Sequence, residues 1–303
     1  MHFADHLIAE MKKKNSAVCV GLDPRLAQIP AFIVNEQREI HGDTFTAVAN
    51  AFLVFNKGII DAVKDLVPCV KVQIAFYEEY GFQGIWAFEE TCKYAKEAGL
   101  IVIADAKRND IGSTAEAYAK AFIGKTDLFG EKIAVYDADA VTVTPYLGYD
   151  GIKPFIEASN HGEKGIFVLV KTSNPSAGDL QERVTVDEKM SVAALMAHFV
   201  ESWGSEDLGE SGYSNVGAVV AGNSKKEAET LRKIMPSTFL LVPGYGAQGG
   251  GAEDVAPCFA EDGFGAIVNN SRGIIFASDG VDYAEAARDA VIKMNEDLNG
   301  VRG

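Results

Sequence analysis

Several charged residues directly follow an apolar run in the segment LIVIADAKRND, from Leu100 to Asp110. The apolar half is typical of a buried strand, and a buried strand seldom ends in charge. Because side chains alternate between the two faces of a strand, Asp105 and Lys107 are predicted to share one face. Acidic and basic groups that perturb one another in this way are typical of functional sites.

Two further charged residues belong to other apolar runs. Lys71 lies between two valines whose face suits packing against helices, so the lysine is predicted to point the opposite way. Asp23 ends the first run, VCVGLD. A structural ion pair between Asp105 and Lys107 is the simpler explanation, but buried ion pairs often add little net stability. Two lysines and two aspartates around one site therefore favour a catalytic role.

Asp110 lies beyond the predicted strand end. The segment STAE, Ser113 to Glu116, has the pattern of a capping box, which predicts Ser113 as the N-cap of the next helix. Asp110, Ile111 and the following glycine are then expected in a loop. On this pattern alone Asp110 could equally be a solvated loop carboxylate.

A glycine-rich segment, PGYGAQGGGAED from Pro243 to Asp254, includes Gln248 and follows the seventh apolar run. Backbone N–H groups in such a loop can bind phosphate, although a flexible loop has the same composition. Arg272 ends the eighth run and could form a bidentate contact to phosphate, or lie free on the surface.

Lys171, at the end of the fifth run, is a rival catalytic residue, because a desolvated lysine can form a Schiff base. A charged strand end is the simpler interpretation. His161 and His198 are expected to be structural, because no His, Asp and Glu spacing of a metal site surrounds them.

These residues need a scaffold that brings strand ends together. Eight short apolar runs rich in valine and isoleucine, with helical patterns in most gaps, predict a (β/α)₈ TIM barrel; a doubly wound sheet is the alternative. We expect one domain over residues 1–303, with insertions near 26–42 and 173–213. A barrel places its site at the carboxyl ends of the strands, and phosphate commonly binds after strands seven and eight. The runs begin at Ala17, Cys69, Ile101, Ala140, Ile166, Val216, Phe239 and Ala266.

Composition narrows the classes of partner. The chain has 303 residues, 48% of them hydrophobic, which is enough for a large core. Its net charge of −15 argues against nucleic-acid or anionic-membrane partners. Four cysteines without a CxxC motif suggest a reducing compartment. The first residues lack the apolar core of a signal peptide, and no run approaches the length of about 18 apolar residues that a membrane span needs, so a cytoplasmic protein is expected.

Four segments, in the same order along the chain, resemble the orotidine 5′-phosphate decarboxylase family. DAKRNDI fits the family pattern D-x-K-x-x-D-I, and PGYGAQGG is similar to its phosphate loop. GLDPR resembles the end of its first strand and VKVQIAFYE its second-strand lysine. The long insertions and the segment TSNPSA look most like the type 2 branch. The resemblance implies a cofactor-free, metal-free homodimer that converts orotidine 5′-monophosphate to UMP and CO₂.

The resemblance also implies roles for individual residues. Lys71, Asp105, Lys107 and Asp110 match the alternating charge array of the family. Its last aspartate reaches into the neighbouring subunit's site with the nearby isoleucine and threonine. The substrate contacts implied are Asp23 and Lys71 to ribose, Ser173 to the pyrimidine, Gln248 and Arg272 to phosphate, and Asp110, Ile111 and Thr114 across the dimer. Ser271 stands where many members have glycine.

Three other functions stay open on the sequence. The barrel could belong to a Mg²⁺-dependent decarboxylase or epimerase of sugar phosphates, which shares the Asp-x-Lys pattern. It could be a Schiff-base aldolase that uses Lys171 or Lys107. It could also be a nucleotide-binding barrel without catalysis, although the complete set of two lysines and two aspartates argues against this.

Overall fold

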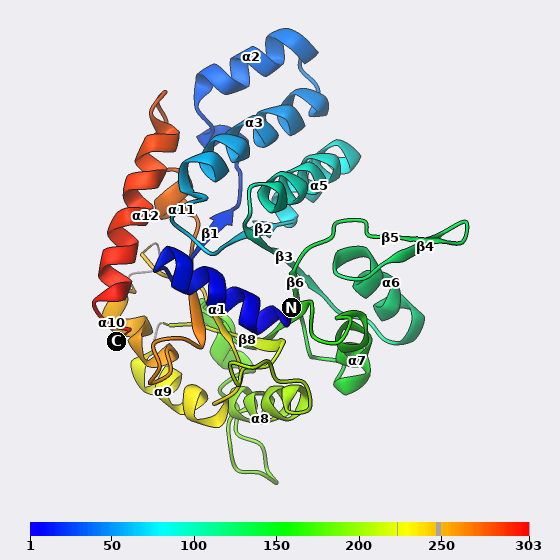
Figure 1. Ribbon diagram of the computed structural model, residues 1–303, viewed down its shortest axis with the longest axis vertical. Coiled ribbons are helices and arrows are strands. Elements are labelled where there is room, and N and C mark those ends of the chain that lie inside the picture. The colour runs from blue at the N-terminus through cyan, green and yellow to red at the C-terminus, as the bar shows by residue number, and fades with distance from the viewer. Residues whose placement is uncertain (223, 247–249, 303) are drawn as a thin grey trace.

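A computed structural model describes residues 1–222, 224–246 and 250–302, and it is a single-domain (β/α)₈ barrel (Figure 1). Eight parallel strands close in the order β1-β10-β9-β8-β7-β6-β3-β2. Each of the eight predicted apolar runs supplies one barrel strand, so the barrel is confirmed and the doubly wound alternative is wrong. The barrel strands are β1 Val18–Leu22, β2 Cys69–Gln73, β3 Ile101–Arg108, β6 Ala140–Val143, β7 Gly165–Lys171, β8 Val216–Val220, β9 Leu240–Val242 and β10 Ala266–Asn270.

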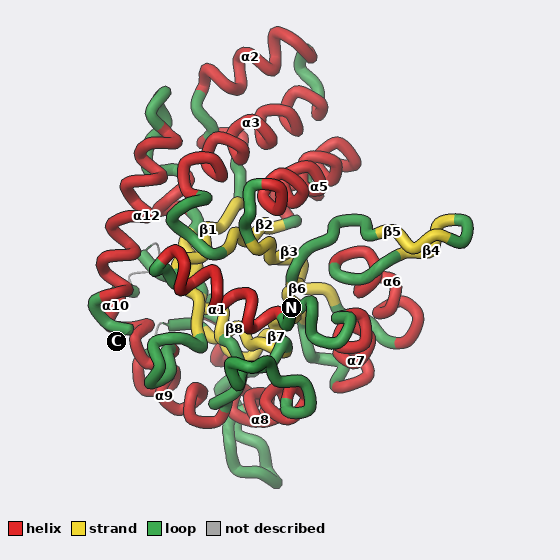
Figure 2. The backbone as a smooth tube through the Cα atoms, viewed as in Figure 1, coloured by secondary structure: helices red, strands yellow, loops and turns green. Residues whose placement is uncertain are grey.

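Helices surround the barrel because each strand needs an apolar cover on its outer face (Figure 2). α1 instead closes the amino-terminal end, where the ring of Phe3 meets that of Phe167 at 6.1 Å. The open end is therefore the carboxyl end of the strands, called the barrel mouth below. The helices are α1 Phe3–Lys14, α2 Ala31–His41, α3 Phe45–Val63, α4 Ala75–Glu78, α5 Gly81–Glu97, α6 Gly112–Phe122, α7 Tyr149–Ala158, α8 Val192–Gly204, α9 Lys225–Ile234, α10 Ala252–Val255, α11 Arg272–Ile275 and α12 Tyr283–Asn299.

The strand register decides which polar residues meet at the mouth. Lys71 of β2 pairs with Ile103 of β3, and Gln73 pairs with Asp105. Since parallel strands carry their carboxyl ends to the same edge, these polar residues come together above an apolar barrel interior.

The segments predicted as insertions contain structure of their own. Residues 26–42 form the 3₁₀ turn Leu26–Gln28 and α2, which packs on α3. Residues 173–213 include the 3₁₀ turn Pro175–Asp179 and α8. The sequence analysis missed the hairpin of β4, Thr126–Leu128, and β5, Glu131–Ile133. Its strands are short, exposed and lack an apolar alternation, so they gave no strand signal.

The predicted capping box is wrong. α6 begins at Gly112, with Ile111 as its N-cap and no side-chain cap. Gly112 has a φ of +52°, a conformation that glycine adopts without steric cost. Glu116 then lies within the helix and pairs with Lys120, at 3.6 Å between Oε2 and Nζ.

Contrary to the sequence-based expectation, α3 is long and apolar enough by length and composition to span a membrane. In the fold, α3 packs against α2, α5 and α12, and its buried face includes Phe52, Phe55 and Ile59. A helix that covers a globular core has the same composition, so this property is weak evidence for a membrane span.

The packing of α3 predicts a large loss of stability when Phe55 is shortened. The ring of Phe55 is fully buried and stacks on Phe276 at 5.8 Å and on Tyr283 at 5.3 Å. Phe55→Ala should lower the free energy of unfolding by about 3–5 kcal/mol in denaturant titrations, because it leaves a cavity. Phe82, on α5, is 80% exposed, so Phe82→Ala should change that free energy by less than about 0.5 kcal/mol. Equal effects would show that Phe55 is not part of the core.

Candidate active site

The carboxylate of Asp105 is the centre of a hydrogen-bonded cluster at the barrel mouth. Its Oδ1 accepts from Lys107 Nζ at 2.5 Å and from Thr142 Oγ1 at 2.9 Å. Its Oδ2 accepts from Lys71 Nζ at 2.7 Å and from Gln73 Nε2 at 2.9 Å. Asp105 is 5% exposed, so these four donors replace the water that an ionised carboxylate would otherwise need.

Opposite charges keep the buried Asp105 and Lys71 side chains ionised. Burial alone would raise the pKa of Asp105, but the charges of Lys71 and Lys107 and their hydrogen bonds lower it well below its usual range. Burial would likewise lower the pKa of Lys71, whereas the charges of Asp105 and Asp23 raise it above its usual value. Asp23 Oδ1 lies 3.8 Å from Lys71 Nζ. At neutral pH the site therefore presents the Asp105 carboxylate beside the Lys71 cation.

Lys107 reaches the mouth through an irregularity in β3. The pairing of β3 with β6 shifts between Ala104 and Arg108, and Lys107 has a φ of +47°, which non-glycine residues seldom adopt. Its side chain is 44% exposed, its ammonium pairs with Asp105, and both residues line an open cavity. The sequence correctly predicted that Lys107 meets Asp105, but simple strand alternation did not anticipate the bulge.

Two adjoining hollows extend from this cluster and share Lys71, Asp105, Pro243 and Asn269. The first has a volume of about 400 Å³, and its remaining lining is Lys107, Thr142, Leu169, Thr172, Ser173, Asn174, Val219 and Leu241. The second has a volume of about 320 Å³, and its remaining lining is Asp23, Arg25, Gln73, Gly244, Tyr245, Asn270, Ser271 and Arg272. One hollow thus offers an apolar wall beside Lys107, and the other offers two guanidinium groups. The size and polarity suit an anionic ligand of nucleotide dimensions.

The structure brings together most of the predicted site residues. Asp23, Ser173 and Arg272 line the hollows, each at the end of a different strand. Gln248 lies outside the described residues. Ser271 is the N-cap of α11 and lines the second hollow.

Among the residues that line the hollows, the sequence analysis did not single out Arg25, Gln73, Thr142 and Asn269. Gln73 lies two residues after Lys71 on the same face, so strand alternation could have identified it. Thr142 is the one polar residue of the strand segment AVTV, which is also a signal. Oδ1 of Asn269 is buried and has no hydrogen-bond partner among the described residues.

Three predicted residues lie apart from these hollows. Asp110, Ile111 and Thr114 occupy the loop after β3 and the start of α6, and none of them lines either hollow. Asp110 Oδ1 accepts from the Ile111 N–H at 2.8 Å, and Ile111 is 55% exposed. Within one chain, this segment therefore does not complete the site.

Lys171 also lies outside the hollows. Its Nζ pairs with Glu182 at 2.7 Å and with Glu227 at 3.1 Å. Burial would lower the pKa of Lys171, but these two carboxylates raise it above its usual value. A Schiff base requires a neutral amine, so the structure favours the charged strand end over the catalytic lysine.

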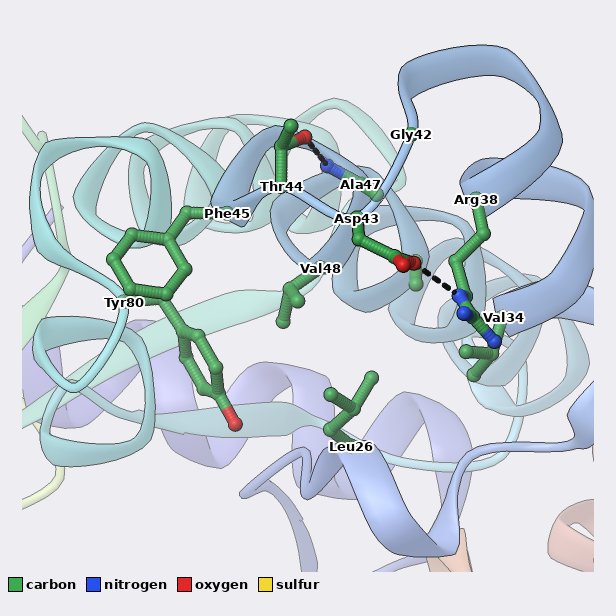
Figure 3. Close-up of a pocket in the computed structure, with 11 residues that line it drawn as sticks. Leu26, Val34, Arg38, Gly42, Asp43, Thr44, Phe45, Ala47, Val48 and Tyr80 are labelled. Atoms are coloured by element: carbon green, nitrogen blue, oxygen red, sulfur yellow. Dashed lines mark hydrogen bonds and ion pairs between the residues drawn. The ribbon is translucent and has the colours of Figure 1, made fainter.

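A separate hollow of about 280 Å³ lies between α2 and α3 and shares no residue with the other two (Figure 3). Its wall is largely apolar, with Leu26, Val48 and Tyr80, and the pair Arg38–Asp43 at 2.7 Å lies beside it. Among residues 1–222, 224–246 and 250–302, no group of three or more His, Cys, Asp or Glu side chains is placed to hold a metal ion.

Comparison with known proteins identifies the family of this site. Residues 16–287 match the model of the orotidine 5′-phosphate decarboxylase / HUMPS family. The chain is 45% identical over 309 residues to orotidine 5′-phosphate decarboxylase of Rhodopirellula baltica, covering 99% of this chain and 100% of that protein. It is 43% identical over 277 residues to the enzyme of Caldicellulosiruptor saccharolyticus, covering 91% and 90%. The chain belongs to this family.

The solved structures agree with this family assignment. The structure of Leishmania donovani OMP decarboxylase has a TM-score of 0.76 and 30% identity, and covers 100% of this chain and 99% of that one. The family match begins before β1 and ends within α12, so it includes every barrel strand. The Asp105 cluster of this chain is therefore built on the barrel of the orotidine 5′-phosphate decarboxylase / HUMPS family.

The lowered pKa of Asp105 predicts a specific pH dependence of stability. A carboxyl with a lowered native pKa stabilises the fold above the unfolded-state pKa of about 3.9, and this contribution is lost as the pH falls towards the native pKa. Asp105→Asn should lower the free energy of unfolding by about 3–5 kcal/mol at pH 7, because it leaves Lys71 short of its main buried partner. The difference from wild type should shrink between pH 4 and pH 3, measured by urea unfolding.

Asp187 is exposed, so Asp187→Asn should have the same free energy of unfolding as wild type at pH 7 and at pH 3. A difference between wild type and Asp105→Asn that stays constant from pH 7 to pH 3 would contradict the charged cluster.

Proposed function

We propose that this chain decarboxylates orotidine 5′-phosphate to UMP and CO₂, without a cofactor or metal. The observation that supports this most strongly is the buried Asp105 carboxylate between the Lys71 and Lys107 ammonium groups, at the mouth of a barrel of this family. The adjoining hollow with Arg25 and Arg272 suits the phosphate end of such a substrate.

The cluster fits the chemistry of this reaction. The bond between C6 and the carboxyl group breaks, CO₂ leaves, and the electron pair stays on C6 in the plane of the ring. Because the ring π system cannot delocalise that pair, it must be stabilised by charge prepared in advance. The Lys107 ammonium would provide this charge and then donate a proton to C6. Asp105, close to the substrate carboxylate, would disfavour the bound ground state.

Substrate contacts follow from the two hollows. The apolar wall of Leu169, Val219 and Leu241 suits the departing CO₂ beside Lys107. Asp23, with a buried Oδ1 that accepts no hydrogen bond among the described residues, would join Lys71 at the ribose. Ser173 would contact the pyrimidine. Gln248 and Arg272 would bind the phosphate, whose binding energy can orient the ring for reaction.

The active unit would be a homodimer with shared sites. Asp110, Ile111 and Thr114 lie outside the hollows of their own chain and are exposed or half-buried, as residues that enter a partner's site would be. Four buried cysteines, none in a disulfide, support a reducing and hence cytoplasmic location.

The direct test is loss of orotidine 5′-phosphate absorbance with purified protein treated with EDTA. Activity that survives EDTA supports this function over a Mg²⁺-dependent sugar-phosphate decarboxylase. Binding of UMP without turnover would favour a non-catalytic nucleotide-binding barrel instead.

Removal of Lys107 should abolish most of this activity. Lys107→Ala removes both the cation and the proton donor, and a loss of about 4 kcal/mol in transition-state stabilisation corresponds to a rate lower by about a thousandfold. Lys293→Ala, which changes an exposed lysine of α12, should keep the wild-type rate. Near-normal turnover by Lys107→Ala would refute the role assigned to this residue.

Mixing two inactive variants tests the shared site. In a mixed dimer of Lys107→Ala and Asp110→Ala chains, one site would carry both changes and the other would carry neither. Random exchange makes half of the dimers mixed, so about a quarter of wild-type activity should return. The control pairs Lys107→Ala with Asp105→Asn, two residues of one chain's cluster, and should recover nothing. If subunits exchange and the first mixture also stays inactive, Asp110 acts within its own chain.

A further inference from the structure

Thr142 contacts both catalytic groups of β3 from the neighbouring strand β6. Its hydroxyl accepts from the backbone N–H of Lys107 at 2.9 Å and donates to Asp105 Oδ1 at 2.9 Å. Thr142 is 1% exposed and is the polar member of the strand segment AVTV. A polar side chain is costly at such a position unless its hydrogen bonds are satisfied, and both of these bonds go to the reacting cluster.

The hydroxyl of Thr142 can make these two bonds in one arrangement only. It has a single proton, so when it accepts from the Lys107 N–H its own proton must point to an acceptor. The ionised Asp105 carboxylate is that acceptor, and it donates nothing in return. The two hydrogen bonds therefore form a chain that runs in one direction, from the Lys107 N–H to the Thr142 hydroxyl and from that hydroxyl to the Asp105 carboxylate. This chain couples the backbone of Lys107 to the orientation of Asp105.

The backbone of Lys107 needs such a partner. Ala104 pairs with Val141 and Arg108 with Val143, so the residues between them form a bulge that leaves the regular ladder. Lys107 has a φ of +47° within this bulge. A non-glycine residue holds this conformation only when its surroundings impose it, and the hydrogen bond to Thr142 lies at that point.

We propose that Thr142 is a positioning residue that holds the Lys107 ammonium and the Asp105 carboxylate in the correct positions relative to the reacting carbon. This inference rests on the proposed decarboxylase function for its effect on rate, and on the hydrogen bonds alone for its effect on structure. Without the hydroxyl, the Lys107 N–H loses its partner, the bulge can relax and Asp105 loses one of its four donors. The ammonium then moves away from the position that favours reaction.

Two substitutions at this position separate the hydroxyl from the shape of the side chain. Thr142→Val keeps the volume and removes the hydroxyl, whereas Thr142→Ser keeps the hydroxyl and removes a methyl group. Because misplacement of a catalytic group by about 1 Å can cost on the order of a hundredfold, Thr142→Val should lower kcat by about 10- to 100-fold. KM should stay within about threefold of wild type, because the hollow with Arg25 and Arg272 is unchanged. Thr142→Ser should retain a kcat within about threefold of wild type.

A second readout does not depend on activity. Hydrogen exchange of the Lys107 backbone amide should quicken by about tenfold or more in Thr142→Val and stay slow in Thr142→Ser. Affinity for UMP, measured by calorimetry, should be similar in all three proteins and confirms that each is folded. If Thr142→Val does not fold, Thr142→Ala provides the same comparison, with lower kcat and faster exchange than Thr142→Ser.

The outcomes separate this inference from the proposed function. If wild type does not consume orotidine 5′-phosphate, the proposed function fails, and amide exchange still decides whether Thr142 holds Lys107. If Thr142→Val has wild-type kcat and exchange, or if Thr142→Ser is as impaired as Thr142→Val, the positioning role is wrong.

Discussion

Asp105 is an ionised carboxylate in a nearly closed environment, and the site depends on the four donors that surround it. An unpaired charge of this kind would be expelled from the interior or neutralised. Its donors come from three strands: Lys71 and Gln73 from β2, Lys107 from β3 and Thr142 from β6. A change in the register of any of these strands would remove a donor, so the cluster depends on the pairing of β2, β3 and β6.

The same requirement explains two irregular features of the fold. β6 must lie directly beside β3, so the chain between them, with its β4–β5 hairpin, is excluded from the barrel. β3 must also leave its regular ladder near Lys107, because a regular strand would not bring that backbone N–H to the Thr142 hydroxyl. Both features favour a reactive arrangement of charges over the most regular strand pairing, as is common near catalytic sites.

Charge is arranged locally in a protein that is acidic as a whole. The net charge of −15 would repel an anionic ligand at long range, yet Lys71, Lys107, Arg25 and Arg272 gather around the two hollows. The apolar wall lies beside Lys107, and the guanidinium groups lie beyond the Asp105 cluster. Under the proposed function, this separation would let phosphate binding and charge development occur at different ends of one cleft.

The sequence by itself predicted the eight parallel strands, the shared face of Asp105 and Lys107 and the inward direction of Lys71, because burial on both faces and side-chain alternation are visible in the residue types. The array that joins Lys71 to Asp105 and Lys107 was implied only by the family resemblance. The sequence did not predict the bulge at Lys107, the start of α6 at Gly112 or the part that Thr142 plays. These depend on which strand lies beside which, on a backbone conformation that a lysine adopts only under tertiary constraint, and on a hydrogen bond between residues 35 positions apart. Lys171 also shows what the sequence could not decide. Its position at a strand end matched that of a catalytic lysine, and only the folded chain brings Glu182 and Glu227 into ion pairs with its ammonium.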